Sequence, residues 1–246
     1  MKWKAVIFDF FGTLVGNFSI GEHNQVLSRM AEVLSVPRDD FARMWVETFP
    51  DRATGVIPTI EANIEYICRA LGCSVTGVQM TAASDIRLHF YRRSVRPRPG
   101  VLEALIRLKA EGYRVGLITD CSSELPKLWS STPFASLIDV AVFSCCVGVR
   151  KPDPRIYRLA CKRLGVVPQD CLYVGDGSSR ELTGASAVGM QPLLIRPPYE
   201  ETHDFIRIDV EEWSGPSVSH ISDILTFIKS AQGGEEQDET SRGCRV

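Results

Sequence analysis

Residues 4–14 read KAVIFDFFGTL, an apolar run that brings one carboxylate, Asp9, to a glycine turn. Four to eight β-branched and aromatic residues bounded by glycine are typical of a strand that is covered on both faces. In open α/β sheets the ligand crevice lies beyond the carboxyl ends of the strands, so an acid at this point is well placed for chemistry. A plain turn cap by Asp9 explains the same pattern, and the run alone does not separate the two interpretations.

The composition indicates a globular protein with a small-molecule substrate. The 246 residues suffice for one α/β domain and a smaller insert, and 44% hydrophobic content supports a sizeable core. The net charge is −2 and no basic run is present, which argues against nucleic acid or an anionic membrane as partner. The eight cysteines contain no Cys-x-x-Cys pair and are expected to be reduced. Without a leader-like start or a long apolar window, we expect a cytoplasmic protein.

A helical insert follows the first strand. Apolar residues at helical spacing predict a helix that contains Val26, Met30 and Leu34, and Pro37 closes it. Further helices are predicted at about 39–48, 59–71 and 79–94, and a proline-rich stretch then breaks the pattern. We therefore expect a four-helix insert over residues 17–94, lying above Asp9.

The remainder of the chain alternates between helices and strands. The predicted helices are 100–111, 123–131, 153–164 and 179–188, and the predicted strands are 113–119, 138–143, 171–175 and 191–195. This alternation predicts an α/β fold with a parallel sheet, built from residues 1–16 and 95–230. Residues 196–219 are expected to be irregular apart from a short strand at 205–208. A final helix is expected at 220–230 and a disordered tail over 231–246.

Polar residues follow three further segments, at Thr119-Asp120, at Arg150-Lys151 and at Asp176 with Glu181. Residues 147–150 are expected to be a strand end like the other two. A hydroxyl can hold phosphoryl oxygens, a lysine supplies a compact positive charge, and two or three carboxylates can hold Mg²⁺. The set indicates the chemistry of phosphate.

Together these segments resemble the haloacid dehalogenase superfamily. Its four motifs are matched by Asp9-Phe10-Phe11-Gly12-Thr13, by Thr119, by Lys151-Pro152-Asp153 and by Gly175-Asp176 with Glu181. The resemblance implies a Rossmann-like core, and it identifies the helical insert as a C1 cap.

The resemblance also implies roles for individual residues. Asp9 would be the nucleophile, forming an aspartyl ester or phosphate that water hydrolyses, while Thr119 and Lys151 hold the transferring group. Mg²⁺ would be the cofactor. The implied substrate-binding residues are Gly12, Thr13, Asp120 and Arg150, and the implied metal ligands are Asp9, the Phe11 carbonyl, Asp176 and Glu181.

Phe11 departs from the family pattern, because phosphatases of the family have there an Asp that protonates the leaving oxygen. The 2-haloacid dehalogenases have an aromatic residue in that place and need no acid, but they work without metal, whereas Asp176 and Glu181 match the phosphatase motif. Three interpretations stay open: an Mg²⁺-dependent phosphatase acting on a small phosphorylated metabolite, a 2-haloacid dehalogenase-like hydrolase, and a catalytically weak phosphate-ester binding or regulatory protein.

Residues of the insert could offset the missing acid. The candidates are Glu47, Asp51, Arg52 and His89, none of which the sequence places at the site. Asp120 stands where the family often has Asn. A carboxylate there would repel phosphate unless a cation such as Arg150 paired with it, and hydrogen bonding across the strand ends is the alternative.

Overall fold

The computed structural model describes residues 2–196, 210 and 212–231. Its described strands form one parallel sheet in the order β3-β2-β1-β4-β5-β6. They are β1 (Ala5–Phe8), β2 (Arg114–Thr119), β3 (Val140–Phe143), β4 (Cys171–Gly175), β5 (Gln191–Ile195) and β6 (Ser217–Val218). This confirms the predicted α/β, Rossmann-like class. The chain order reverses between β1 and β4, the place where such sheets bind ligands.

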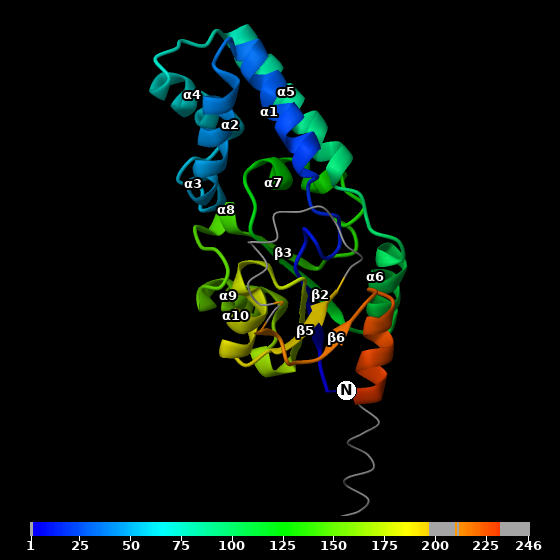
Figure 1. The fold of residues 1–246 in the computed structure, drawn as a ribbon. Helices are drawn as coiled ribbons and strands as arrows, with labels where there is room; N and C mark the ends of the chain where they lie inside the picture. Colours follow the sequence, from blue (N-terminus) through cyan, green and yellow to red (C-terminus); the bar gives the residue numbers. More distant parts are fainter. Residues whose placement is uncertain (1, 197–209, 211, 232–246) are drawn as a thin grey trace, which may run out of the picture.

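Strand β1 is apolar throughout because both faces of the sheet are covered. Val6 and Phe8 belong to one core cluster, and Ala5 and Ile7 belong to the other. Helix α6 (Val101–Ala110) and the helical residues 223–231 pack on the first face. Helices α9 (Pro154–Leu164) and α10 (Glu181–Ala187) pack on the second (Figure 1).

The insert stands beyond the carboxyl ends of the strands, at the opposite end of the molecule from the N-terminus (Figure 1). Its helices are α1 (Ile20–Leu34), α2 (Arg38–Glu47), α3 (Phe49–Ala53), α4 (Ile60–Ala70) and α5 (Gly77–Ser94). The prediction of four helices is therefore wrong by one. Helix α3 has five residues and a proline near its start, so it is too short for a helical period to be visible. The division into a core and a cap domain stays a prediction.

The two connections to the insert run side by side. Val15 and Pro97 form an antiparallel bridge, and the Arg98 N–H donates to the Leu14 carbonyl at 3.0 Å. The Arg98 guanidinium also donates to the carbonyls of Gly12 at 3.2 Å and Val15 at 3.3 Å. Arg98 thus links the segment that leaves the core to the segment that returns to it.

The structure corrects two predictions in the second half of the chain. Ser144–Val147 form a short helix, α8, so residues 147–150 are a helix end and a loop rather than a strand end. Strand β6 lies in the segment predicted to be irregular, and its two residues pair with β5.

Other predictions agree to within a few residues or cannot be compared. The final predicted helix is present at 223–231, and the predicted helix 123–131 comprises α7 (Glu124–Leu128) and a 3₁₀ turn, η1 (Trp129–Ser131). The predicted strand 205–208 and residues 232–246 of the predicted tail lie outside the described residues.

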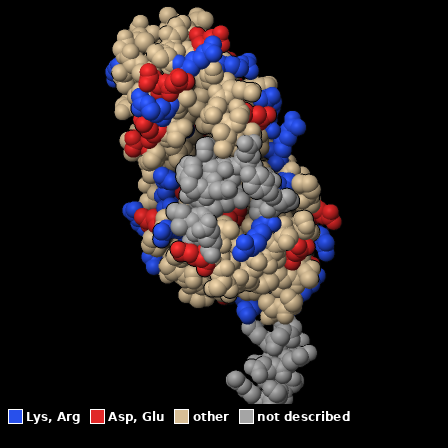
Figure 2. All heavy atoms as spheres, viewed as in Figure 1, with Lys and Arg blue, Asp and Glu red and all other residues tan. Residues whose placement is uncertain are grey.

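Acidic and basic side chains are interspersed over the face drawn in Figure 2, in agreement with the balanced composition. Within the described ranges, no helix combines the length and the apolar character that crossing a bilayer requires.

Candidate active site

Three carboxylates meet at the switch point of the sheet. Asp9 follows β1, Asp176 follows β4 and Glu181 begins α10, and all three are buried. One oxygen from each lies within 4.8 Å of the others. Carboxylates this close repel one another strongly at low dielectric, so the arrangement favours a nearby cation or a bound proton.

Lys151 supplies positive charge at this cluster. Its Nζ lies 2.5 Å from Asp9 Oδ1 and 2.6 Å from Glu181 Oε2. Burial opposes the ammonium form, but Asp9 and Glu181 outweigh it and raise the pKa of Lys151 well above its usual range. Burial raises the pKa of Asp9 to about 6; Lys151 opposes this rise and Asp176 adds to it. Three acids against one lysine leave an excess of two negative charges when all are ionised, which suits a divalent cation.

Glu181 is held by three donors. Besides Lys151, the Tyr173 hydroxyl donates to Oε2 at 2.9 Å and the Gly177 N–H donates to Oε1 at 3.0 Å. Burial, with Asp9 adding to it, raises the pKa of Glu181 well above its usual range. A carboxylate with this many partners fixes the position of the lysine ammonium, whether or not it also contacts a metal.

Two glycines leave room for the carboxylates. Gly12 has φ +83°, and a Cβ at this residue would lie 2.0 Å from Asp176 Oδ2. A Cβ at Gly175 would lie 2.2 Å from Glu181 Oε1. Since Cβ atoms do not approach oxygens so closely, a side chain at either glycine would displace an acid of the site.

Thr13 of the first motif and Thr119 of the second motif have buried hydroxyl groups. Thr13 lies in the turn after β1 and Thr119 ends the neighbouring strand β2. Neither hydroxyl, nor Asp9 Oδ2, has a hydrogen-bond partner within the described part of the chain. Buried polar atoms are normally paired, so these three oxygens mark the place of a hydrogen-bonding ligand.

Asp120 and Arg150 lie beside the lysine loop. Asp120 Oδ1 accepts from the Lys151 N–H at 3.1 Å, and Arg150 Nε lies 3.5 Å from Asp120 Oδ2. The Arg150 guanidinium also lies over the Phe49 ring of α3, at 5.3 Å from the ring centroid. The carboxylate is thus paired with the cation that the sequence suggested, and it fixes the backbone beside Lys151.

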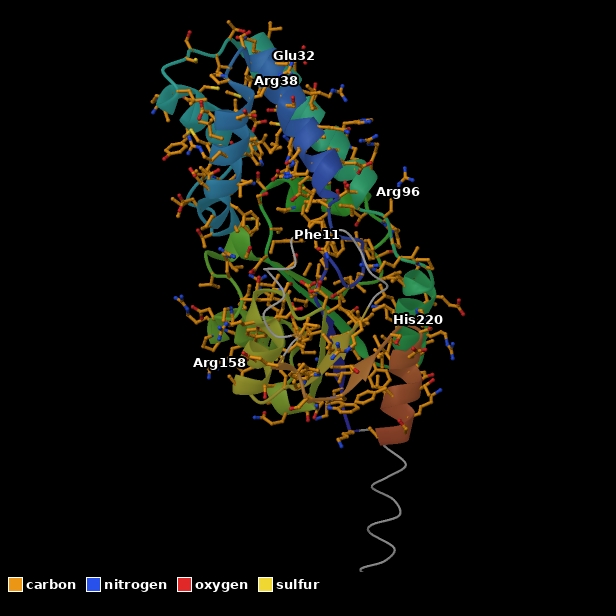
Figure 3. All side chains as sticks on the ribbon, in the orientation of Figure 1. Phe11, Glu32, Arg38, Arg96, Arg158 and His220 are labelled. Atoms are coloured by element: carbon orange, nitrogen blue, oxygen red, sulfur yellow. The ribbon has the colours of Figure 1, made fainter. Side chains whose placement is uncertain are left out.

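Phe11 lies between the insert and the sheet (Figure 3). Its ring centroid is 5.1 Å from that of Phe10, 4.9 Å from that of Phe18 and 6.2 Å from that of Tyr91. The residue at the general-acid position is therefore part of an aromatic cluster that joins both parts of the molecule.

The structure separates the four insert candidates. Glu47, Asp51 and His89 are exposed, and Glu47 is paired with Arg43. Only Arg52 is buried against the core, where its Nη1 donates to Ser122 Oγ at 3.2 Å.

Sequence reasoning missed Tyr173 as a site residue. It lies in the middle of β4, where an aromatic residue reads as ordinary strand packing. The available signal was its hydroxyl, because a phenol buried in an apolar strand needs a hydrogen-bond partner.

Comparisons with known proteins identify the family of this chain. The family described as haloacid dehalogenase-like hydrolase matches residues 3–189. A glyceraldehyde 3-phosphate phosphatase from Methanopyrus kandleri is 31% identical over 78% of this chain and 84% of its own length. An (S)-2-haloacid dehalogenase from Pseudomonas fluorescens is 29% identical over 71% of this chain and 77% of its own length.

A solved structure shares the fold. The 2-haloacid dehalogenase from Pseudomonas syringae superposes with a TM-score of 0.70 at 20% identity, covering 93% of this chain and 99% of that one. The chain belongs to the haloacid dehalogenase-like hydrolases, as its motifs predict, and it is a hydrolase.

Proposed function

We propose that the protein is an Mg²⁺-dependent phosphatase that acts on a small phosphorylated metabolite, with Asp9 as the nucleophile. The observation that carries this proposal is the buried cluster of three carboxylates, two of which are paired with Lys151. A cluster with excess negative charge suits a divalent cation, and the resemblance assigns such a cation to phosphatases rather than to dehalogenases. The similarity to glyceraldehyde 3-phosphate phosphatases supports the same choice.

In the proposed reaction an Asp9 carboxylate oxygen attacks phosphorus and the ester oxygen leaves with the bonding electrons. Water then attacks the aspartyl phosphate, releases inorganic phosphate and restores the carboxylate. Lys151 holds Asp9 in place and offsets negative charge, and the hydroxyls of Thr13 and Thr119 are free to donate to phosphoryl oxygens.

Mg²⁺ would be held by Asp9, Asp176, the Phe11 carbonyl and, directly or through other groups, Glu181. When bound, it neutralises charge that develops on the transferring phosphoryl group. The close approach of the three buried carboxylates fits this assignment.

Phe11 donates no proton, so the leaving oxygen must depart as an anion or take its proton from water. Loss of a general acid costs about 10²–10⁴ in rate. The proposed enzyme is therefore best suited to esters with good leaving groups.

A second candidate, a 2-haloacid dehalogenase, is favoured by Phe11 itself. The aromatic residue stands where the resemblance places one in dehalogenases, and a relative of that activity is 29% identical. In this reaction Asp9 displaces halide from carbon and water hydrolyses the resulting ester, so no acid is needed.

A screen of phosphate esters and 2-haloacids, with Mg²⁺ or with EDTA, tests both candidates. Phosphate and halide are measured in each well, and Asp9→Asn protein is the control for contaminating activity. Release of phosphate that EDTA abolishes is expected. Halide release that survives EDTA would transfer the assignment to the dehalogenase, and binding of esters without release of phosphate would mark a regulatory protein.

A further inference from the structure

A second group of buried charges lies where the insert contacts the core. Arg87 of α5 donates through Nε to Glu124 Oε1 of α7 at 2.8 Å. Arg52 of α3 donates through Nη1 to Ser122 Oγ at 3.2 Å and through Nη2 to the Trp45 carbonyl at 2.7 Å. The exposed fractions are 4% for Arg52, 2% for Arg87 and 1% for Glu124. We call these five residues the arginine cluster.

The charges of the arginine cluster do not balance. Two guanidiniums face one carboxylate, and no other carboxylate in the described residues is within ion-pair distance of either arginine. Burial lowers the pKa of Arg52 to about 10, so the guanidinium still carries its charge at neutral pH. A buried charge without a counter-ion is costly, so the cluster is suited to receive one further negative charge.

The polar atoms without partners in the arginine cluster are all donors. They are Arg52 Nε, Arg87 Nη1 and Trp45 Nε1, each buried and without an acceptor among the described residues. The two guanidinium carbons lie 4.8 Å and 5.1 Å from the centroid of the Trp45 ring, so the three donor side chains are neighbours. A group that satisfies three N–H donors and adds negative charge is an oxyanion.

The arginine cluster adjoins the candidate active site. Ser122 follows Thr119 by three residues in the loop after β2. The Tyr91 ring packs against Phe11 at 6.2 Å and against the Arg87 guanidinium at 5.0 Å. One aromatic ring therefore separates the cluster from the residue at the general-acid position.

We infer that Arg52, with Arg87 and Trp45, binds a second oxyanion of the substrate, at the end away from the reacting phosphate. This inference rests on the proposed phosphatase function and narrows its substrate class to small phosphate esters that carry a carboxylate or a second phosphate. The guanidiniums are buried by contact of the insert with the core, so the oxyanion is enclosed between these two parts. Enclosure strengthens charge-assisted hydrogen bonds by excluding water.

Calorimetric titration of Asp9→Asn protein in Mg²⁺ tests the inference without depending on turnover. The probes are 3-phosphoglycerate and glycerol 3-phosphate, which differ by a carboxylate in place of a hydroxymethyl group. Fructose 1,6-bisphosphate and fructose 6-phosphate form the corresponding pair for a second phosphate. We expect about 10- to 100-fold tighter binding of the doubly anionic member of at least one pair.

Added to this background, Arg52→Gln is expected to remove most of the preference and Arg52→Lys to keep part of it. Arg43→Gln is the matched control, since Arg43 is an exposed arginine of the insert that pairs with Asp40 and Glu47. If Arg52→Gln lowers the melting temperature too far, Trp45→Phe removes one donor and keeps a ring, and its preference is measured instead.

Equal binding of both members of each pair, a preference that Arg52→Gln leaves intact, or binding of none of the four probes would overturn the inference. Arg52 would then be a structural clamp that ties α3 to Ser122. Release of phosphate from these esters by the unsubstituted enzyme is measured in parallel. That assay decides the proposed function separately, since an enzyme can hydrolyse both members of a pair without preferring either.

Discussion

The two carboxylate oxygens of Asp9 have different surroundings. Oδ1 is paired with Lys151, whereas Oδ2 is buried and lacks a hydrogen-bond partner in the described structure. An oxygen without hydrogen bonds keeps its lone pairs available, so Oδ2 is the atom that we expect to attack.

The substitution Asp9→Asn is expected to abolish turnover and to leave the fold intact. The amide is a far poorer nucleophile than the carboxylate. It has nearly the same shape, so no cavity forms, and it removes one of three mutually repelling charges. Initial rate and melting temperature are measured on the same preparation. Undiminished turnover would remove Asp9 from the mechanism.

Phe11→Asp is expected to raise the rate for alkyl phosphates and to raise it much less for p-nitrophenyl phosphate. An alkoxide gains from protonation, whereas a nitrophenolate leaves without a proton. The gain will be below the full 10²–10⁴ of a general acid, because the aromatic neighbours of Phe11 do not orient a carboxylate.

Phe11→Asn is the control for the Phe11→Asp experiment, because it removes the ring without adding an acid. Rates on both ester types are compared for the two variants. If they behave alike on alkyl phosphates, Phe11 acts by packing or by contact with the substrate, and the dehalogenase interpretation gains support.

At the scale of elements, helices α5 and α7 are joined by the buried pair of Arg87 and Glu124. Burial alone would raise the pKa of Glu124, but Arg87 and Arg52 outweigh burial and hold this pKa below its ordinary value. The carboxylate therefore stabilises the folded protein above the pKa that it has in the unfolded chain, and this contribution is lost as the pH falls through the lower pKa of the folded state.

We expect Glu124→Gln to lower the free energy of unfolding at pH 7 by about 3–5 kcal/mol, since it leaves two buried guanidiniums without a carboxylate. The dependence of the unfolding free energy on pH below about pH 4.3, the usual pKa of a glutamate, should also become shallower. Urea unfolding at several pH values measures both effects. An unchanged slope below that pH would show that Glu124 does not titrate with folding.

Long periodic elements could be predicted from the sequence, and short ones could not. The predicted ranges 59–71, 79–94 and 153–164 lie within a few residues of the observed bounds of α4, α5 and α9. Helix α8 has four residues, SCCV, whose composition suits a strand equally well. Strand β6 is defined by its pairing with β5, and its two residues are too few to show an alternation of apolar and polar residues in the sequence.

The site was predictable as far as its motifs extend along the chain. Asp9 and Asp176 each follow a buried strand, and parallel strands bring such ends to one edge of the sheet. Lys151 follows a loop and was identified by its motif alone. The arginine cluster was not predictable, because Arg52 and Ser122 are 70 residues apart and meet only when the insert has packed against the core. Local patterns do not specify such long-range contacts between parts of a molecule.

For the whole molecule, metal binding and folding should be coupled. A ligand that binds the folded state alone stabilises it, by about 2.7 kcal/mol at one hundred times its dissociation constant. Because Mg²⁺ would relieve the repulsion among three buried acids, we expect it to raise the melting temperature and EDTA to reverse the rise.

Two substitutions should separate metal binding from support of the fold. Asp176→Ala is expected to weaken Mg²⁺ binding strongly. Glu181→Ala is expected to weaken it less and to cost more stability, since it removes a partner of Lys151, Tyr173 and Gly177. Calorimetry with Mg²⁺ and thermal melts are run on both. Unchanged Mg²⁺ affinity in Asp176→Ala would end its assignment as a ligand.

The two chain connections between the insert and the core lie together at Val15 and Pro97. Arg98 links the two connections by donating to backbone carbonyls. These carbonyls are present whatever the sequence of the insert. Residues 16–96 can therefore be exchanged as one segment, provided that the new segment supplies partners for Ser122 and Glu124 of the core. If the corresponding segment of another family member were joined to this core, the substrate specificity would follow the insert and the catalytic residues would stay those of the core.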